Sequence, residues 1–361
     1  MNETQTVQQT SFEQITTLVS AQFQIEEALL EHGVPTYYLK QPQETKQAFL
    51  RLLKNLEPMG LVGLLRRKNG KIVLKIVPKP QTKPSDIRIN WLLLFATIGT
   101  TFITGYWLSE HPINPIIGGA TFTIAIMAVL GMHEMGHKLT ANRNGIDATP
   151  PYFIPGPPPF LGGFGTFGAV IMQKSLAPNR DSLFDMGTSG PTISFILATV
   201  ATIIGLPFST IGWVEKETPT LPAPFLIVLL ELAFPFLIPP IKTPKPGPNY
   251  VPVIYLHPVA VAGWIGLIVT LLNLFPAAML DGGHISRALF GEKISAYLTF
   301  FSVIFMFFIS PVMAIFVLFL SMYRHPGPLD EVSSLSMKRK IFAVVLAIIF
   351  VLCLFPPMSI F

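Results

Sequence analysis

Three ionisable side chains lie close together in the stretch GMHEMGHK: His133, Glu134 and His137. Residues four apart lie on the same face of an α-helix, so two imidazoles at this spacing can bind one zinc ion. The carboxylate beside the first imidazole can then act as a base toward a water molecule held by the metal. The alternative is a polar cluster at a helix end, next to Lys138, whose charged groups extend to a membrane surface.

A zinc ion with two histidine ligands needs a third protein ligand, because a catalytic site keeps its fourth position for water. A thiolate cluster is excluded, since the chain has a single cysteine, Cys353. Asp281, in the stretch NLFPAAMLDGGH, is the best candidate, although by itself this motif fits equally well a residue that caps the segment after it. The other aspartates lie in expected polar loops or outside the expected spans: Asp147, Asp181 and Asp185, and Asp86 and Asp330.

Membrane-spanning helices must position these residues, because the chain carries too few charges to cover a soluble globule of its size. Half of its 361 residues are apolar and 12% are charged, with a mean hydropathy of +0.54. We predict an all-α polytopic protein of the lipid bilayer. Apolar runs of spanning length predict helices at about 91–108, 116–139, 187–206, 252–275 and 340–356, and two shorter helices within 294–323, separated at Ser310-Pro311.

One further apolar segment, 222–241, has spanning length but is predicted not to cross the membrane. Lysine and arginine residues before the first span place the N-terminal side in the cytoplasm, so the helix that carries His133 returns to that side. A full crossing by 222–241 would put Asp281 on the opposite face of the membrane. We therefore interpret this proline-ended segment as re-entrant or interfacial, which gives about seven transmembrane helices plus this piece.

Residues 1–85 are polar and mixed in charge, and we predict that they form a small cytoplasmic α+β domain, with 86–361 as the transmembrane domain. Helix-like apolar spacing runs from Phe12 to Leu30, and a second helix is expected over 43–57. The dipeptide Asn69-Gly70 lies between two strand-like runs, which predicts a type I′ hairpin.

A glycine-rich stretch, GGFGTFGAVIMQ at 162–173, shows the alternating apolar pattern of a strand or hairpin. At membrane depth such backbone is tolerated only where protein lines a cavity. Its edge is suited to pair with an unwound substrate segment, because a transmembrane helix hides its peptide bonds in its own hydrogen bonds. We therefore predict a membrane-embedded β-hairpin here. The alternative is a glycine-rich loop that only connects two helices.

Four stretches together resemble the site-2 proteases, intramembrane zinc metalloproteases of family M50: GMHEMGHK, GGFGTFGAVI followed by GTSGP, HPVAVAGW, and NLFPAAMLDGGH. They are most similar to the plastid and cyanobacterial ethylene-dependent gravitropism-deficient and yellow-green type. The resemblance covers about 91–356 and implies proteolysis, inside the membrane, of single-span or signal-peptide-like proteins. The N-terminal region resembles that type only in being an extended soluble region. No PDZ module is recognisable between the central spans.

The resemblance also implies roles for individual residues. His133, His137 and Asp281 resemble the ligands of one Zn²⁺ ion per chain, and Glu134 resembles the general base. Asn273 is similar to an asparagine whose amide stabilises the tetrahedral oxyanion, with helix breaking as the alternative. The expected substrate contacts are made by the strand residues Gly165, Thr166, Phe167 and Gly168.

The remaining histidines give weaker signals. His284 follows the Asp281 turn, where it could hydrogen-bond a metal ligand or merely satisfy the turn. His257 precedes a proline at a helix start, which is more typical of an interfacial residue. His32, His111 and His325 lie away from the motif helices, so no metal role is expected for them.

Two other functions fit parts of the pattern. A divalent-metal transporter would also bind zinc at membrane depth, but it would need Glu134 as a ligand or proton carrier. A non-catalytic relative that binds membrane proteins would be expected to have lost the acid or a ligand. The expected partners are membrane protein substrates with a transmembrane segment, and no nucleic acid. The N-terminus lacks the features of a signal or transit peptide, which favours a prokaryotic cell membrane with the N-terminus in the cytoplasm.

Overall fold

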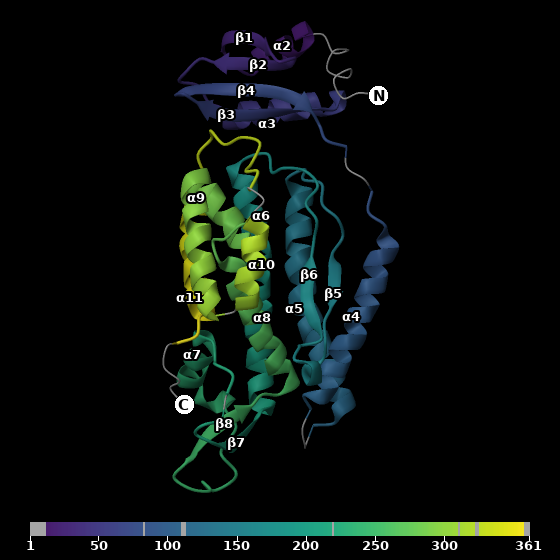
Figure 1. Cartoon of the computed structure of the whole chain (residues 1–361), viewed down its shortest axis with the longest axis vertical. Coiled ribbons are helices and arrows are strands. Elements are labelled where there is room, and N and C mark those ends of the chain that lie inside the picture. Colours follow the sequence, from purple (N-terminus) through teal and green to yellow (C-terminus); the bar gives the residue numbers. More distant parts are fainter. Residues whose placement is uncertain are drawn as a thin grey trace.

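The structure, a computed structural model, describes residues 12–81, 84–109, 113–218, 220–309, 311–321 and 325–356. Figure 1 shows an elongated helical body with a small sheet at one end and a two-stranded hairpin at the other. The helices are α2 (Phe12–Ser20), α3 (Lys46–Leu56), α4 (Ile87–Trp107), α5 (Pro115–Arg143), α6 (Arg180–Gly205), α7 (Phe225–Ala233), α8 (Pro258–Leu274), α9 (Asp281–Ile309), α10 (Pro311–Ser321) and α11 (Met337–Cys353). The strands are β1 (Ile25–Glu31), β2 (Val34–Leu39), β3 (Leu61–Lys68), β4 (Lys71–Pro78), β5 (Tyr152–Pro155), β6 (Thr166–Val170), β7 (Thr210–Glu215) and β8 (Tyr250–Tyr255).

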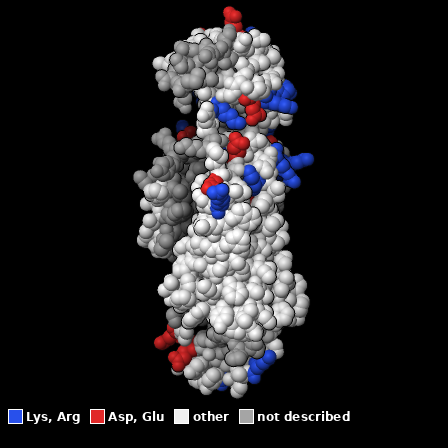
Figure 2. All heavy atoms as spheres, turned by 90° about the vertical axis from the view of Figure 1, so that its right-hand side faces the viewer, with Lys and Arg blue, Asp and Glu red and all other residues white. Residues whose placement is uncertain are grey.

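Among the described helices, α4, α5, α6 and α9 are long and apolar enough to cross a membrane, and α8 is a shorter apolar helix. On the face shown in Figure 2, charged side chains gather toward the two ends and leave an uncharged band between them. An uncharged band suits the hydrocarbon core of a bilayer, where an ionised side chain costs several kcal/mol. The structure is therefore that of a mainly helical membrane protein with small sheets.

Helix α6 begins earlier than the apolar pattern predicts, at Arg180 instead of 187. The side chain of Asn179 caps it by accepting a hydrogen bond from the Ser182 backbone N–H at 2.9 Å. Asp181 and Asp185 therefore lie in its first turns, and their predicted place in polar loops is wrong. Their charges are paired with Arg339 of α11, at 3.0 and 2.6 Å, which explains why a polar stretch can form this helix end.

The predicted helix at 252–275 is wrong at its start, because α8 begins only at Pro258. The preceding residues pair instead with β7 as the antiparallel strand β8, with Thr210 opposite Tyr255. This stretch is rich in valine, isoleucine and tyrosine, whose side chains favour strands over helices. Helix α8, which follows this strand, is therefore shorter than the predicted span.

A four-stranded antiparallel sheet, in the order β1-β2-β4-β3, forms the N-terminal unit together with α2 and α3. Asn69 and Gly70 turn from β3 to β4 with φ values of 50° and 80°, so the predicted type I′ turn is confirmed. The predicted helix from Phe12 to Leu30 is wrong beyond Ser20, because pairing with β2 draws residues 25–31 into a strand.

The N-terminal sheet is attached to the helical body by the segment between α10 and α11. Leu329 is buried in the core of the sheet, and its carbonyl accepts a hydrogen bond from the Leu65 backbone N–H at 2.9 Å. Glu331 forms ion pairs with Arg66 of β3 and Arg287 of α9. These contacts join the sheet to the helix that carries Asp281. The domain boundary at residue 85 itself stays a prediction.

The segment predicted to be re-entrant, 222–241, contains α7 and ends in a short 3₁₀ turn at Pro235–Leu237. The nine residues of α7 span about 14 Å, well short of the roughly 30 Å hydrocarbon core. Within 294–323, α9 ends at Ile309 and α10 starts at Pro311, while Ser310 lies outside the described residues. A left-handed Gly291, with φ of 79°, separates the first turns of α9 from its apolar part.

Candidate metal centre

The structure brings together the two histidines of α5 and the first residue of α9. The Nε2 atoms of His133 and His137 lie 3.1 Å apart, and each is 3.2 Å from a carboxylate oxygen of Asp281. Ligand atoms about 2.05 Å from a tetrahedral zinc ion are separated by roughly 3.3 Å. The spacing of these three side chains therefore fits a zinc ion, whose protein ligands would be two imidazoles and one carboxylate.

All three side chains are shielded from solvent. His133 is 3% exposed and His137 is 6% exposed, while the Asp281 side chain retains 14%. Glu134 is also buried, with one carboxylate oxygen 3.9 Å from His133 Nε2. The expected carboxylate thus lies beside the cluster without joining it, as a proton acceptor requires.

The second nitrogen of each imidazole faces α6. His137 Nδ1 donates to the backbone carbonyl of Met186 at 2.8 Å, and His133 Nδ1 lies 3.1 Å from Ser194 Oγ. Such outer hydrogen bonds orient imidazoles in metal sites and leave the opposite nitrogen for the ion. Met186 and Ser194 were not predicted from the sequence, because neither residue type nor spacing indicates that α6 contacts the imidazoles of α5.

Two glycines of the GTSGP stretch let α6 approach the cluster closely. A Cβ atom added at Gly190 would meet the imidazole nitrogens of both His133 and His137. A Cβ atom added at Gly187 would lie 2.6 Å from the backbone oxygen of Asp281. Side chains at either position would push α6 away from α5 or α9, so glycine is required at both.

Asn273 and His284 lie near Asp281 along the chain, but among the described residues no hydrogen bond joins either side chain to the cluster. Asn273 is half-buried in the last turn of α8, and its side chain has no hydrogen-bond partner among the described residues. His284 turns its Nδ1 atom toward His325 Nε2, at 2.7 Å. Burial lowers the pKa of His325 to about 3, so this ring is neutral. The prediction that His325 lies away from the motif helices is wrong, because its ring contacts His284 of α9.

Of the predicted strand at 162–173, residues 166–170 form β6, which pairs in antiparallel fashion with β5. Thr166 lies opposite Pro155, Phe167 is 73% exposed, and Gly168 has a left-handed φ of 102°. The carbonyl of Gly165 accepts a hydrogen bond from Thr100 of α4 at 2.6 Å, which fixes the start of the strand. The hairpin therefore lies against α4 and leaves an aromatic side chain uncovered.

Beyond its last residue, β6 leads back to the cluster. The backbone of Ile171, the next residue, lies close to the Glu134 carboxyl group. On the other side of the strand pair, the Phe153 ring of β5 lies 3.4 Å from the position of a Cβ added at Gly131 in α5. The strand pair thus lies along the part of α5 that carries the three ionisable residues.

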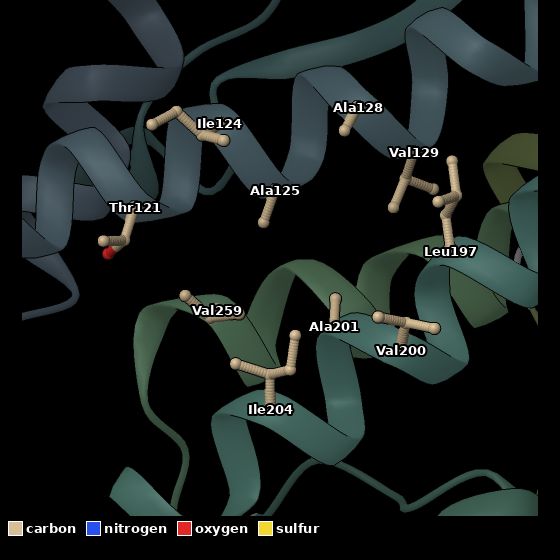
Figure 3. Close-up of a pocket in the computed structure, with 10 residues that line it drawn as sticks. All are labelled: Thr121, Ile124, Ala125, Ala128, Val129, Leu197, Val200, Ala201, Ile204 and Val259. Atoms are coloured by element: carbon tan, nitrogen blue, oxygen red, sulfur yellow. The ribbon is translucent and has the colours of Figure 1, made fainter.

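A separate apolar cavity of about 290 Å³ lies between α5, α6 and the start of α8 (Figure 3). Its lining is apolar except for Thr121, and it includes Ala125 and Val129 of α5 and Val259. None of the cluster residues lines this cavity. Thr121 is the one polar side chain in this lining, and no ionisable group lines it, so the cavity does not compete with the cluster as a candidate catalytic site.

Comparison with known proteins gives one family match. Residues 121–315 match peptidase family M50. The chain is 26% identical over 273 residues to "Probable zinc metalloprotease EGY2, chloroplastic" of Oryza sativa subsp. indica, covering 71% of this chain and 47% of that protein. It is 29% identical over 254 residues to EGY2 of Arabidopsis thaliana, covering 65% and 42% of the two chains. A match to "Probable zinc metalloprotease EGY3, chloroplastic" of Oryza sativa subsp. japonica is 27% identical over 295 residues, covering 74% and 48%.

The chain spans about half the length of the curated relatives it matches. No solved structure matches it. The printed names place these relatives in chloroplasts, so the comparisons do not support the predicted prokaryotic membrane. The matched residues 121–315 include His133, His137 and Asp281, together with β6 and the glycines of α6.

Proposed function

The chain belongs to peptidase family M50, and on this basis we propose that it is an intramembrane zinc metalloprotease that hydrolyses peptide bonds in or near transmembrane segments of membrane proteins. The convergence of two imidazoles and one carboxylate at the spacing of a zinc site carries the proposal. The names of its relatives, which are zinc metalloproteases, agree with it. The cluster lies on helices that are apolar enough to span a membrane.

His133, His137 and Asp281 would hold the zinc ion in this mechanism. Zinc, when bound, supplies a Lewis acid that polarises a peptide carbonyl and makes water more acidic. Glu134 takes a proton from the attacking water and returns it to the amine that leaves. Asn273 donates an amide hydrogen bond to the oxyanion that forms on the carbonyl. The 3.9 Å separation of Glu134 from His133 Nε2 supports a base that stands beside the metal ligands.

The substrate would bind as an extended segment along β6. Gly165, Thr166, Phe167 and Gly168 provide this edge, and β6 is paired with β5 alone among the described strands. An added strand replaces the backbone hydrogen bonds that a transmembrane helix loses when it unwinds. The approach of Ile171 to Glu134 supports this path, because a segment paired along β6 then runs toward the base.

The proposed topology has about seven spans, with 222–241 re-entrant and the N-terminal domain, 1–85, on the cytoplasmic side. Helices α4, α5, α6 and α8 then cross in alternating directions. This places His133, His137 and Asp281 at the end of the bundle that faces the N-terminal sheet. The short length of α7 supports these crossing directions, because its nine residues cannot cross the bilayer and so do not add a span between α6 and α8.

Cleavage by purified protein tests this function. Single-span substrates are incubated in detergent with the wild type and with Glu134→Gln, and zinc content is recorded for both. We expect the wild type to cut, and the variant to keep zinc but to cut at least 100-fold more slowly. Zinc flux into liposomes that Glu134→Gln abolishes, without cleavage by the wild type, would instead indicate a transporter. An intact zinc site without cleavage of any substrate would indicate a non-catalytic binding protein.

A further inference from the structure

A chain of buried hydroxyl groups reaches His133 from the far side of the metal centre. Ser194 of α6 and Thr270 of α8 are both fully buried. Ser194 Oγ lies 3.1 Å from His133 Nδ1 and 2.9 Å from Thr270 Oγ1. Thr270 Oγ1 in turn lies 2.8 Å from the backbone carbonyl of Gly266. Three separate helices thus contribute to one hydrogen-bonded line.

The direction of this line follows from counting protons, since each hydroxyl carries one. A carbonyl only accepts, so the Thr270 hydroxyl gives its proton to Gly266. Thr270 Oγ1 is then an acceptor for Ser194, whose own proton is used in that bond. With its proton given to Thr270, or to the Pro191 carbonyl at 3.2 Å, Ser194 Oγ accepts from His133 Nδ1. A reversed bond, from Ser194 to His133, would require the Thr270 hydroxyl to leave the Gly266 carbonyl and to donate to Ser194 instead.

This direction selects one tautomer of His133. A neutral imidazole has one N–H group, and here it must be at Nδ1, so Nε2 carries the free lone pair. That lone pair points toward Asp281 and His137, where the zinc ion would lie. His137 has the same tautomer for a different reason. Its Nδ1 donates to the carbonyl of Met186, which can only accept.

We propose that Ser194 and Thr270 are positioning residues that hold His133 in its metal-binding tautomer and orientation. This inference rests on the proposed function, since it assumes that His133 is a zinc ligand. A backbone carbonyl ensures this for His137, but a hydroxyl alone could donate or accept. Thr270 favours the accepting role of Ser194, because at 2.9 Å it is the closer of two acceptors for the Ser194 proton, the other being the Pro191 carbonyl at 3.2 Å. Thr270 therefore acts on the metal site only through Ser194.

Zinc affinity, measured by competition with a chelator, tests the two residues. We expect Ser194→Ala to bind zinc about 10 to 100 times more weakly than the wild type. Thr270→Val should show a smaller loss, because Ser194 can still donate to the Pro191 carbonyl at 3.2 Å. Thr270→Ser retains the hydroxyl and should restore wild-type affinity. The matched control is Thr199→Val in α6, whose hydroxyl bonds only to its own helix and whose loss should change nothing.

The double variant Ser194→Ala/Thr270→Val separates positioning from general packing. If Thr270 acts only through Ser194, the double variant binds zinc as Ser194→Ala does. Additive losses, or wild-type affinity in Ser194→Ala, would overturn the proposal. His133→Ala distinguishes this failure from failure of the proposed function. If His133→Ala loses zinc while Ser194→Ala does not, only the positioning role is wrong; if His133→Ala keeps zinc, the metal site itself is wrong.

Discussion

Replacing Gly190 by alanine tests the packing that holds the two imidazoles in place. The added Cβ atom would lie 2.7 Å from His133 Nε2 and 2.7 Å from His137 Cε1, whereas ordinary contact begins at 3.4 Å. The rings or the helices must therefore separate by at least 0.7 Å, the difference between 3.4 and 2.7 Å. Because a displacement near 1 Å can lower catalysis about 100-fold, we expect cleavage by Gly190→Ala to fall by about that factor, with weakened zinc binding.

The assay combines chelator competition for zinc with cleavage of a single-span substrate, after size-exclusion chromatography has shown that the variant is folded. Gly99→Ala in α4 is the matched control, because its added Cβ has no atom within 4 Å. This control should bind zinc and cleave as the wild type does, and alanine in a helix should raise its stability by about 0.5 to 1 kcal/mol. Wild-type zinc affinity and cleavage in Gly190→Ala would refute the close approach of α6 to the histidines.

Three further outcomes are expected. Asn273→Ala should lower kcat by about 100- to 1,000-fold with zinc content unchanged, as loss of an oxyanion donor does, and unchanged kcat would exclude that role. Glu331→Gln should lower the free energy of unfolding by about 3 kcal/mol, because the Arg287 side chain is 5% exposed and loses its closest charge partner. Thermal unfolding measures this against Glu26→Gln, whose exposed ion pair with Lys71 contributes less than about 1 kcal/mol. Phe167→Ala should raise KM without changing zinc content, since this exposed ring contacts substrate in the proposed complex; an unchanged KM argues against binding along β6.

The candidate metal centre was visible in the sequence because helical periodicity is a local property. His133 and His137 share a face at a spacing that any α-helix imposes, so the two imidazoles could be paired before any fold was known. Asp281 could be added only from the chemistry of the metal, which demands a third ligand. The structure brings the three side chains together, while their role as ligands stays a prediction.

The surroundings of the cluster could not be predicted, because they depend on how separate helices pack. Ser194 and Met186 contact the imidazoles only because α6 lies against α5, and nothing in a single sequence specifies that face. Gly187 and Gly190 were noted as part of a family motif, but their reason is steric and appears only when the neighbouring rings are in place.

Errors in the predicted elements have a common cause, which is pairing with residues outside the segment whose pattern was used for the prediction. The polar residues at the start of α6 do not fit the apolar pattern of a membrane span. Asp181 and Asp185 nevertheless lie in this helix, because both pair with Arg339, more than 150 positions away along the chain. Residues 25–31 follow a helical apolar pattern but pair with β2. The Asn69-Gly70 turn was predictable because its left-handed backbone is demanded locally, by two residue types that tolerate it.

Zinc content per chain, in protein purified without added chelator, tests the central claim most directly. The measurement compares the wild type with Glu134→Gln and Asp281→Ala. We expect one zinc ion per chain in the wild type and in Glu134→Gln, and almost none in Asp281→Ala, because two imidazoles alone leave the ion without its third ligand. One zinc ion per chain in Asp281→Ala would show that the proposed metal site is wrong, since the metal would then lie elsewhere or be bound without the carboxylate of α9.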